Sequence, residues 1–255
     1  MSEPDYIPNV SGGKDSTDMV HQMLERGERI AAIVSVDYGL EFPEMYEHLR
    51  LFEQKIGMKV WRITSRLPFE YSMINKKVNA KDGSIKYGYG WPSNIRWCTR
   101  DKIRALDYFA GTFKNPVHCV GIAADEDRNS KMSKYPCRYP LQEYGITEQQ
   151  ALDNCYERGY YWGGLYNHFS RVSCFCCPQK SEDDLRKIRR FYPHLWAEML
   201  RMDANQPKHA PGFKNGQSVH DLEEKFRQED QKRQVLKSNL AYPKSPNQTI
   251  LIGCE

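Results

Sequence analysis

Short apolar runs recur along the first half of the chain. Residues 30–36 form a nearly continuous apolar run of strand length. Such a run is typical of a central parallel strand that is covered on both faces. Three further runs have a similar character and are also predicted to be strands, at residues 6–10, 59–63 and 117–122. These four segments are the expected core of a sheet.

Helical patterns lie between these runs. One covers residues 15–26, a second runs from Pro43 to a stop at Gly57, and a third begins with Thr99 as its cap and ends near Gly111. Proline is favoured in the first helical turn, and glycine is favoured just after the last one. Strands that alternate with helices predict a Rossmann-like parallel α/β sheet, which binds ligands at the carboxyl edge of its strands.

The alternation changes in two places. Residues 67–97 are rich in glycine and aromatic residues, which favours a loop inserted over the site. After about residue 140 helices dominate, and they are predicted at residues 147–158, 181–200 and 218–238. We therefore expect an α/β domain over residues 1–140 and a mainly helical, cysteine-containing subdomain over residues 141–255.

Composition narrows the function only slightly. The 255 residues carry a formal net charge of +4, which is too small to indicate a nucleic acid partner without a local basic patch. The longest apolar stretch is far shorter than a membrane span, and the N-terminus lacks the basic start and apolar run of a secretory signal. A cytoplasmic protein without a membrane partner is the expectation.

The loop after the first predicted strand carries candidate chemistry. It reads Ser11-Gly12-Gly13-Lys14-Asp15-Ser16. Two glycines let the backbone approach an anion, and the start of the next helix directs free N–H groups at it. Lys14 adds a positive charge, the serines add hydroxyl donors, and Asp15 can reach a Mg²⁺ ion on bound phosphates. The loop is too short for a Walker A motif and lacks the Rossmann dinucleotide spacing.

The loop closely resembles the SGG-x-DS signature of the PP-loop ATP pyrophosphatases. This resemblance implies the adenine nucleotide alpha hydrolase type of Rossmann-like fold and a loop that holds ATP while it is split to AMP and pyrophosphate. Its backbone and hydroxyl groups would bind the pyrophosphate, at Ser11, Gly12, Gly13 and Ser16. Lys14 would balance the charge, Asp15 would hold Mg²⁺, and Ser16 would complete the catalytic group.

Two later segments support the same resemblance. Residues 37–44 resemble the D-x-G-x-E-F-P-E segment of the phosphoadenosine phosphosulfate reductase-like branch, which makes Asp37 a candidate nucleotide contact. The segment that begins at Gly121 resembles G-I-R-x-D-E-S, but Ala123 replaces the usual arginine. Gly121 and Arg128 are the candidate nucleotide contacts there. Arg128 or Lys131 would supply the missing positive charge, and a solvated basic face is the alternative.

Four of the eight cysteines are candidate metal ligands. Cys174 and Cys177 form a C-x-x-C pair, Cys176 lies between them, and 75 residues separate Cys98 from Cys174. Clustered cysteines in a reducing compartment are more often metal ligands or reactive thiols than disulfides. Cys98 is predicted to lie at a helix start, where the helix dipole favours a thiolate.

This spacing is similar to that of bacterial sulfonucleotide reductases, whose tandem cysteines and later C-x-x-C bind a [4Fe-4S] cluster. Trp97 stands where the first cysteine of the tandem pair would be. The fourth iron is then bound by Cys176 or left open, as in the three-cysteine PP-loop sulfurtransferases. A structural zinc ion and free thiols are the alternatives for the same residues.

Aromatic and basic residues precede both cysteine positions. They are Tyr87, Tyr89, Trp91, Arg96 and Trp97 before Cys98, and Tyr160, Tyr161, Trp162, Tyr166, His168, Phe169 and Arg171 before Cys174. Such a mixture can stack the bases of single-stranded nucleic acid. Packing around a metal subdomain is the alternative.

Three functions are compatible with these features. In the first, ATP adenylates a nucleic acid or nucleotide acceptor that then receives sulfur from a donor protein, similar to tRNA thiolation and DNA phosphorothioation sulfurtransferases. The second is a sulfonucleotide reductase, and the third is a non-catalytic, metal-stapled binding module. The intact loop favours ATP cleavage. Cys254 lacks the glycine and histidine that follow the nucleophilic cysteine in the reductases' E-C-G-x-H motif, which places the reductase second.

Overall fold

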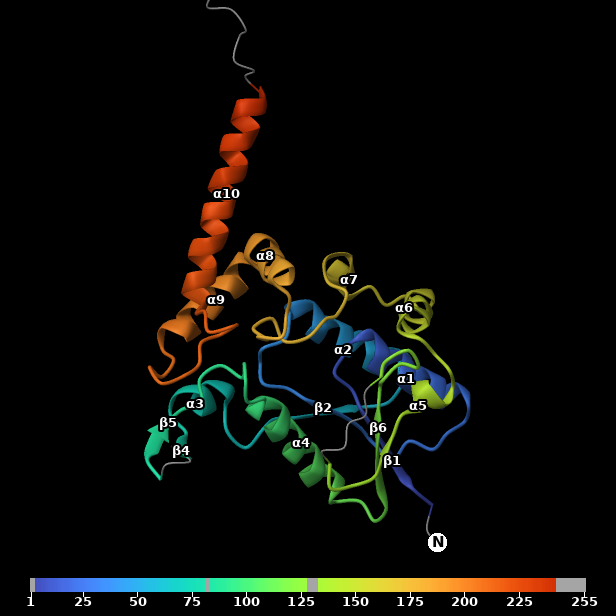
Figure 1. Cartoon of the computed structure of the whole chain (residues 1–255). Helices are drawn as coiled ribbons and strands as arrows, with labels where there is room; N and C mark the ends of the chain where they lie inside the picture. The colour runs from blue at the N-terminus through green and yellow to red at the C-terminus, as the bar shows by residue number, and fades with distance from the viewer. Residues whose placement is uncertain (1–2, 81–82, 128–132, 242–255) are drawn as a thin grey trace, which may run out of the picture.

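A five-stranded parallel sheet forms the centre of the computed structural model, which describes residues 3–80, 83–127 and 133–241, with side chains as far as residue 236 (Figure 1). The strand order is β3-β2-β1-β6-β7, and each pair of neighbours runs parallel. The strands are β1 (Asp5–Asn9), β2 (Ile33–Val36), β3 (Val60–Ile63), β6 (Pro116–Val120) and β7 (Cys137–Arg138). The predicted parallel α/β sheet is confirmed. The strand β7 was not predicted, because two residues are too short to show a strand pattern in the sequence.

Helices cover both faces of this sheet. The helices α1 (Lys14–Glu25) and α2 (Pro43–Ile56) lie on one face, and α4 (Trp97–Ala110) lies on the other (Figure 1). Ile33 and Val34 are both fully buried, because successive residues of a strand point to opposite faces. Val34 packs in a cluster with Ala110 of α4, whereas Ile33 belongs to the cluster that contains Met19 of α1. The chain therefore has a Rossmann-like fold.

Residues 67–97 are not a plain loop. They contain the short helix α3 (Phe69–Ile74) and an antiparallel hairpin of β4 (Lys77–Asn79) and β5 (Ile85–Tyr87). The helix forms because Phe69 and Met73, four residues apart, bury their side chains on one face. The next helix, α4, begins at Trp97 and not at Thr99, because the buried Trp97 ring packs against Phe69.

The C-terminal half is helical, as predicted, but one helix is broken in two. The range 181–200 is divided into α8 (Glu182–Phe191) and α9 (Pro193–Ala204), because proline restricts the residue before it and cannot continue a helical hydrogen-bond ladder. The other helices are α5 (Pro140–Glu143), α6 (Glu148–Glu157), the 3-10 helix η1 (Trp162–Gly164), α7 (Leu165–His168) and α10 (Val219–Ala241). Thr147 and Gln150 form a complete capping box on α6.

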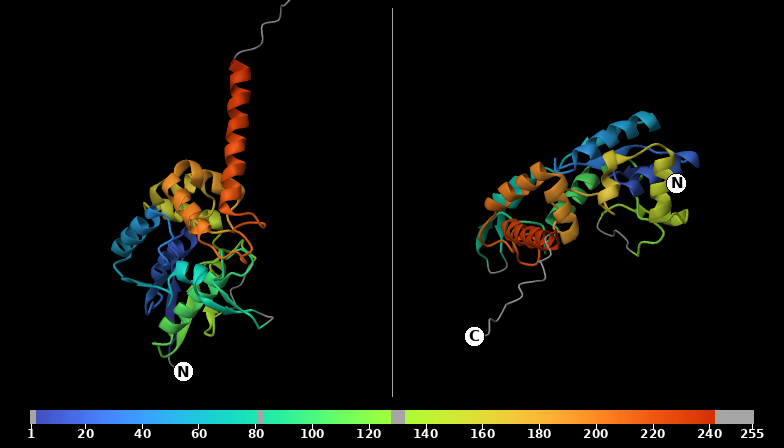
Figure 2. Two further views of the ribbon diagram at one scale, coloured as in Figure 1. Left: turned by 90° about the vertical axis from the view of Figure 1, so that its left-hand side faces the viewer. Right: turned by 90° about the horizontal axis from the view of Figure 1, so that it is seen from above.

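The last helix, α10, starts in the body of the protein and projects away from it (Figures 1 and 2). Its first turns are anchored by three buried residues, Val219, Leu222 and Phe226. These belong to the same hydrophobic cluster as Val10, near the N-terminus. This cluster extends across both halves of the chain, and the domain boundary at residue 140 stays a prediction. Within the described ranges, no helix is both long and apolar enough to cross a membrane.

A buried carboxylate fixes the start of α10. Asp203, at the end of α9, is 4% exposed. Its Oδ1 accepts a hydrogen bond from Trp91 Nε1 at 2.8 Å, and its Oδ2 accepts from the backbone N–H groups of Val219 and His220 at 3.0 and 3.3 Å. The carboxylate therefore joins the 67–97 segment, α9 and α10.

We expect Asp203→Asn to lower the free energy of unfolding by about 1–2 kcal/mol, since the amide turns a donor toward groups that are themselves donors. Urea denaturation followed by circular dichroism measures this loss. Asp221→Asn is the matched control, because Asp221 is exposed and accepts from the Ser218 backbone at the same helix start. Equal losses for the two variants would contradict the role of Asp203.

Candidate functional site

The predicted phosphate loop joins β1 to α1 at the carboxyl edge of the sheet. Gly12 has a φ of +82°, a left-handed conformation that favours glycine. Gly13 is the N-cap of α1, so the first N–H groups of that helix lie at the loop. Ser16 Oγ donates to Gly13 O at 3.0 Å and accepts from Ser11 N at 3.2 Å. The loop thus has the backbone conformation and the helix start that the prediction requires, and anion binding there stays a prediction.

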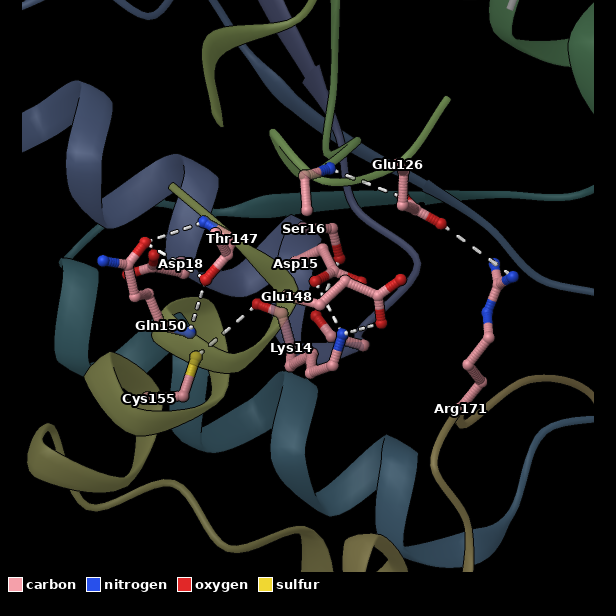
Figure 3. A network of polar contacts seen from close by, with 12 residues as sticks. Lys14, Asp15, Ser16, Asp18, Glu126, Thr147, Glu148, Gln150, Cys155 and Arg171 are labelled. Carbon is pink, nitrogen blue, oxygen red and sulfur yellow. Dashed lines mark hydrogen bonds and ion pairs between the residues drawn. The ribbon is translucent and has the colours of Figure 1, made fainter. Parts of the chain in front are cut away.

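The Lys14 side chain lies in this loop between two carboxylates. Its Nζ donates to Asp15 Oδ1 and to Glu148 Oε2 of α6, both at 2.8 Å, as Figure 3 shows. Burial by itself lowers the pKa of Lys14, but its bonds to Asp15 and Glu148 outweigh this and raise the pKa above its ordinary value. The same bond lowers the pKa of Glu148. Lys14 is thus a fixed positive charge. Its second partner, Glu148, was not predicted from the sequence.

A segment from the C-terminal half covers the loop. Trp162 Nε1 donates to Gly12 O at 2.7 Å, and the backbone N–H of Lys14 donates to the Tyr166 hydroxyl at 2.8 Å. The Tyr166 hydroxyl oxygen would lie 3.4 Å from a Cβ built at Gly13. The Tyr166 hydroxyl oxygen therefore already accepts a hydrogen bond from the Lys14 N–H group, one of the groups that would face a bound phosphate. These two residues were expected only to stack bases or pack near a metal.

Gly121 is placed against the start of α1. A Cβ built there would lie 2.8 Å from Ser16 N and 2.9 Å from the carbonyl carbon and oxygen of Asp15. Only glycine allows this approach, so the third predicted segment does border the phosphate loop. Arg128 and Lys131 lie outside the described residues, and the choice between them stays open.

A pocket opens beside the loop at the carboxyl ends of β1 and β2. Its lining includes Ser11 and the predicted contact Asp37, together with Glu41 of the 37–44 segment and Lys102 of α4. Asp37 Oδ1 accepts from Gly39 N at 2.7 Å and from the Tyr46 hydroxyl at 3.1 Å, which fixes the strand end. The first two predicted segments therefore share one pocket.

The cysteine segment contacts two residues that line this pocket. Cys174 Sγ donates to Glu41 Oε1 at 3.1 Å, and Lys102 Nζ donates to Cys174 Sγ at 3.7 Å. Lys102 Nζ also lies 3.6 Å from Glu41 Oε1. The backbone N–H of Phe175 donates to Leu40 O at 3.0 Å. Lys102 was not predicted, although it follows Cys98 by one helical turn and so shares its face of α4.

The four predicted cysteine ligands come near one another. Burial raises the pKa of the Cys98 thiol, and the nearby Cys177 adds to the rise. Burial likewise raises the pKa of Cys176 well above its ordinary value, with Cys174 and Cys177 contributing. Burial thus opposes the thiolate that the helix start was expected to favour at Cys98, and the thiolate stays a prediction. Soft thiol donors of this kind suit iron or zinc.

The arrangement does not form a complete ligand set. In the part of the chain that the structure describes, no group of three or more histidine, cysteine, aspartate or glutamate side chains could hold a metal ion. A [4Fe-4S] cluster or zinc at Cys98, Cys174, Cys176 and Cys177 therefore stays a prediction.

A buried histidine contacts the helix that follows the loop and one of the aromatic rings that cover the loop. His48 of α2 is 3% exposed, its Nε2 lies 2.9 Å from Thr17 Oγ1, and its ring stacks on Trp162 with centroids 4.4 Å apart. Burial lowers its pKa from 6.5 to about 3, and nearby His21 contributes. The unfolded chain binds this proton below pH 6.5 whereas the folded chain does not. With respect to His48, the folded state therefore has its full stability above pH 6.5, and it loses stability as the pH falls toward 3.

We expect the wild-type protein to lose more stability than His48→Phe between pH 7 and pH 4.5. The difference should be about 2 kcal/mol, since one pKa unit corresponds to about 1.4 kcal/mol. Urea denaturation at the two pH values measures it. His194→Phe, at an exposed position of α9, should behave like the wild type. Parallel losses in all three proteins would refute the assignment.

Comparison with known proteins gives distant relatives. No protein-family model matches the chain. Two uncharacterized proteins of Methanocaldococcus jannaschii are similar to it, at 27% identity over 73% of the chain and 38% of the relative, and at 22% identity over 76% of the chain and 47% of the relative. The chain thus spans less than half the length of these curated relatives.

Among solved structures, the chain is similar to a predicted subunit of tRNA methyltransferase from Methanocaldococcus jannaschii. That alignment has 14% identity and a TM-score of 0.35, and it covers 75% of this chain and 89% of the other. A likeness at this level assigns no activity. By its own sheet and helices the chain is a Rossmann-like α/β protein, in which the predicted phosphate loop lines a pocket whose Glu41 and Lys102 contact Cys174.

Proposed function

We propose that the protein cleaves ATP to AMP and pyrophosphate, adenylates an acceptor, and replaces the activated oxygen of that acceptor with sulfur. One observation carries the proposal: the loop lines a pocket, and two other residues of the same lining contact the cysteine segment. Ser11 of the loop lines it beside Glu41 and Lys102, and both of these charged groups contact Cys174. The proposed phosphate site and the proposed site of sulfur chemistry would thus be adjacent.

In the first step, an acceptor oxygen attacks the α-phosphorus of ATP. A bond forms between that oxygen and phosphorus, the bond to the bridging α–β oxygen breaks, and pyrophosphate leaves with the electron pair. The N–H groups at the start of α1 would hold the departing pyrophosphate, as helix starts do with other anions. Lys14 would neutralise charge that develops on it, because its ammonium is already fixed by Asp15 and Glu148.

In the second step, hydrosulfide supplied by a donor protein attacks the activated centre. A bond to sulfur forms, AMP leaves with the former acceptor oxygen, and no net oxidation or reduction occurs. Lys102 would attract the anionic sulfur, since burial lowers its pKa but the neighbouring Cys174 and Glu41 groups raise it above the ordinary value and so keep the ammonium charged. A metal centre on the cysteines would add a binding position for sulfide.

The test is to incubate the anaerobically purified protein with [α-³²P]ATP, sodium sulfide and either total cellular RNA or plasmid DNA. AMP and pyrophosphate in equal amounts, with acceptor-dependent release, are expected. Formation of ADP and phosphate would refute adenylation. Sulfite release from phosphoadenosine phosphosulfate without ATP cleavage would establish a reductase instead.

Metal content is measured on the same preparation. Iron with a visible absorption band is expected in the wild type, and it should fall in Cys174→Ser but not in Cys137→Ser. Cys137 is the matched control because it is also half-buried and lies in β7, away from the pocket lining. Stoichiometric zinc without iron would replace the cluster assignment.

A further inference from the structure

A second cavity borders α4 on a different face from the phosphate loop. It has a volume of about 1040 Å³ and is lined by the chain that follows β3, by Lys76, by Thr112 just after α4, and by one face of α4, at Asp101, Arg104, Ala105 and Tyr108. These positions recur every three or four residues and so share one side of the helix. Lys102 and Leu106, on another side of α4, line the pocket beside the loop. The helix α4 thus separates the two cavities.

The lining of this groove combines apolar and aromatic surface. Ile63, Leu67, Ala105 and Phe109 contribute apolar atoms. Tyr108 is 84% exposed, so the phenol ring is available to a ligand. Exposed aromatic rings in a groove are the stacking platforms on which proteins hold unpaired bases.

The charged groups of the groove are mainly cationic. Arg66, Lys76 and Arg104 line it together with one acidic residue, Asp101. Asp101 lies 3.7 Å from Lys76 Nζ and 3.3 Å from Arg104 Nη1, and it is largely buried at 8% exposure. Arg66 is exposed and forms no ion pair within the described ranges. The groove therefore presents an excess of positive charge.

We propose that this groove binds a single-stranded segment of nucleic acid and brings it to the phosphate loop. The combination of an exposed ring with spaced cations fits a strand that carries both bases and phosphates. Its volume is at the upper end of the roughly 300–1,000 Å³ of small-molecule pockets, so it accommodates more than one nucleotide unit. That this strand is the acceptor of adenylation rests on the function proposed above.

Tyr38 connects the groove with the pocket. It follows Asp37, its hydroxyl donates to Cys98 O of α4 at 3.5 Å, and its ring lies 5.6 Å from Lys102 Nζ. Tyr38 therefore lies against α4, the helix that separates the groove from the pocket. A single helix, α4, separates the proposed binding groove from the pocket in which the proposed reaction would take place.

The test is fluorescence anisotropy with a fluorescein-labelled 12-nucleotide oligouridine, measured without ATP. Tyr108→Ala is expected to lower the affinity about tenfold, and Tyr108→Phe to leave it within about twofold, because stacking needs the ring and not the hydroxyl. The double variant Arg66→Gln/Arg104→Gln should reduce the slope of log K against log salt by about 1.4, since each phosphate contact of a single strand contributes about 0.7. Arg227→Gln is the control. Like Arg104, Arg227 on α10 is exposed and forms an ion pair with an acidic residue three positions earlier in its helix.

Several outcomes would overturn the proposal. They are absence of binding by the wild type, equal affinity in Tyr108→Ala and Tyr108→Phe, or the same salt slope in the double variant and Arg227→Gln. Full displacement of the oligonucleotide by ATP would also overturn it, because the groove would then be a mononucleotide site. If the oligonucleotide binds as expected but ATP is not cleaved, the groove assignment stands and the proposed function fails.

Discussion

Replacement of Lys14 by methionine is expected to lower the rate of pyrophosphate release from ATP by at least about 100-fold, the usual effect of removing one fixed group that stabilises developing charge. Methionine keeps the length and the apolar stem of the side chain but removes the charge. The ammonium now lies 2.8 Å from both Asp15 and Glu148, so its position at the loop is already set. A steady-state assay of pyrophosphate release measures the effect.

The variant also leaves two carboxylates facing each other without a cation, which destabilises a partly buried site. The double variant Lys14→Met/Glu148→Gln separates this effect from catalysis because it removes one of the two negative charges. We expect the double variant to regain thermal stability but not pyrophosphate release. Recovery of activity in the double variant, or activity within about threefold of wild type in Lys14→Met, would show that Lys14 has no catalytic role.

Gly121→Ala is expected to lower the free energy of unfolding by about 3 kcal/mol, the upper range for a forced contact in a packed interior. The added Cβ meets the backbone of Ser16 and Asp15 at less than 3.0 Å, and backbone cannot rotate away as a side chain would. The first turn of α1 must shift, so ATP binding should weaken as well. Chemical denaturation and isothermal titration with ATP measure the two effects.

Gly111→Ala is the matched control for this variant. Gly111 ends α4 with a φ of −62°, which any residue can adopt. Its nearest contact for an added Cβ is the Tyr135 hydroxyl at 3.0 Å, the end of a side chain that can rotate. We expect a loss below about 1 kcal/mol there. A similar loss at both glycines would mean that the close approach at Gly121 is not tight.

The fold was predictable where local sequence decides it. The run at residues 30–36 and the loop at residues 11–16 are contiguous, so strand, turn and helix start can be recognised within a few residues. The break before Pro193 was available from the sequence as well, because proline ends the preceding helix. The sheet strand at Cys137–Arg138 was not, since two residues carry no period of their own.

The candidate site was only half predictable, for a similar reason. Lys14 and Asp37 stand in recognisable segments, but Tyr166 meets Lys14 across 152 positions of sequence. Glu148 meets the same lysine across 134 positions. Such contacts depend on how the second half of the chain packs on the first, and a tyrosine or glutamate gives no local indication of its distant partner. Tyr108 was likewise hidden, because exposure is a property of the folded surface.

The contacts of Trp162 and Tyr166 with the loop have a consequence for biosynthesis. The loop residues emerge from the ribosome first, but the groups that cover them follow about 150 positions later, at separations of 150 and 152 residues. Because nascent chains fold from the N-terminus onward, an early chain can form the sheet and α1 while the loop is still open. The loop therefore receives these two contacts only when the second half of the chain has been translated, and any reaction that needs them would begin only then.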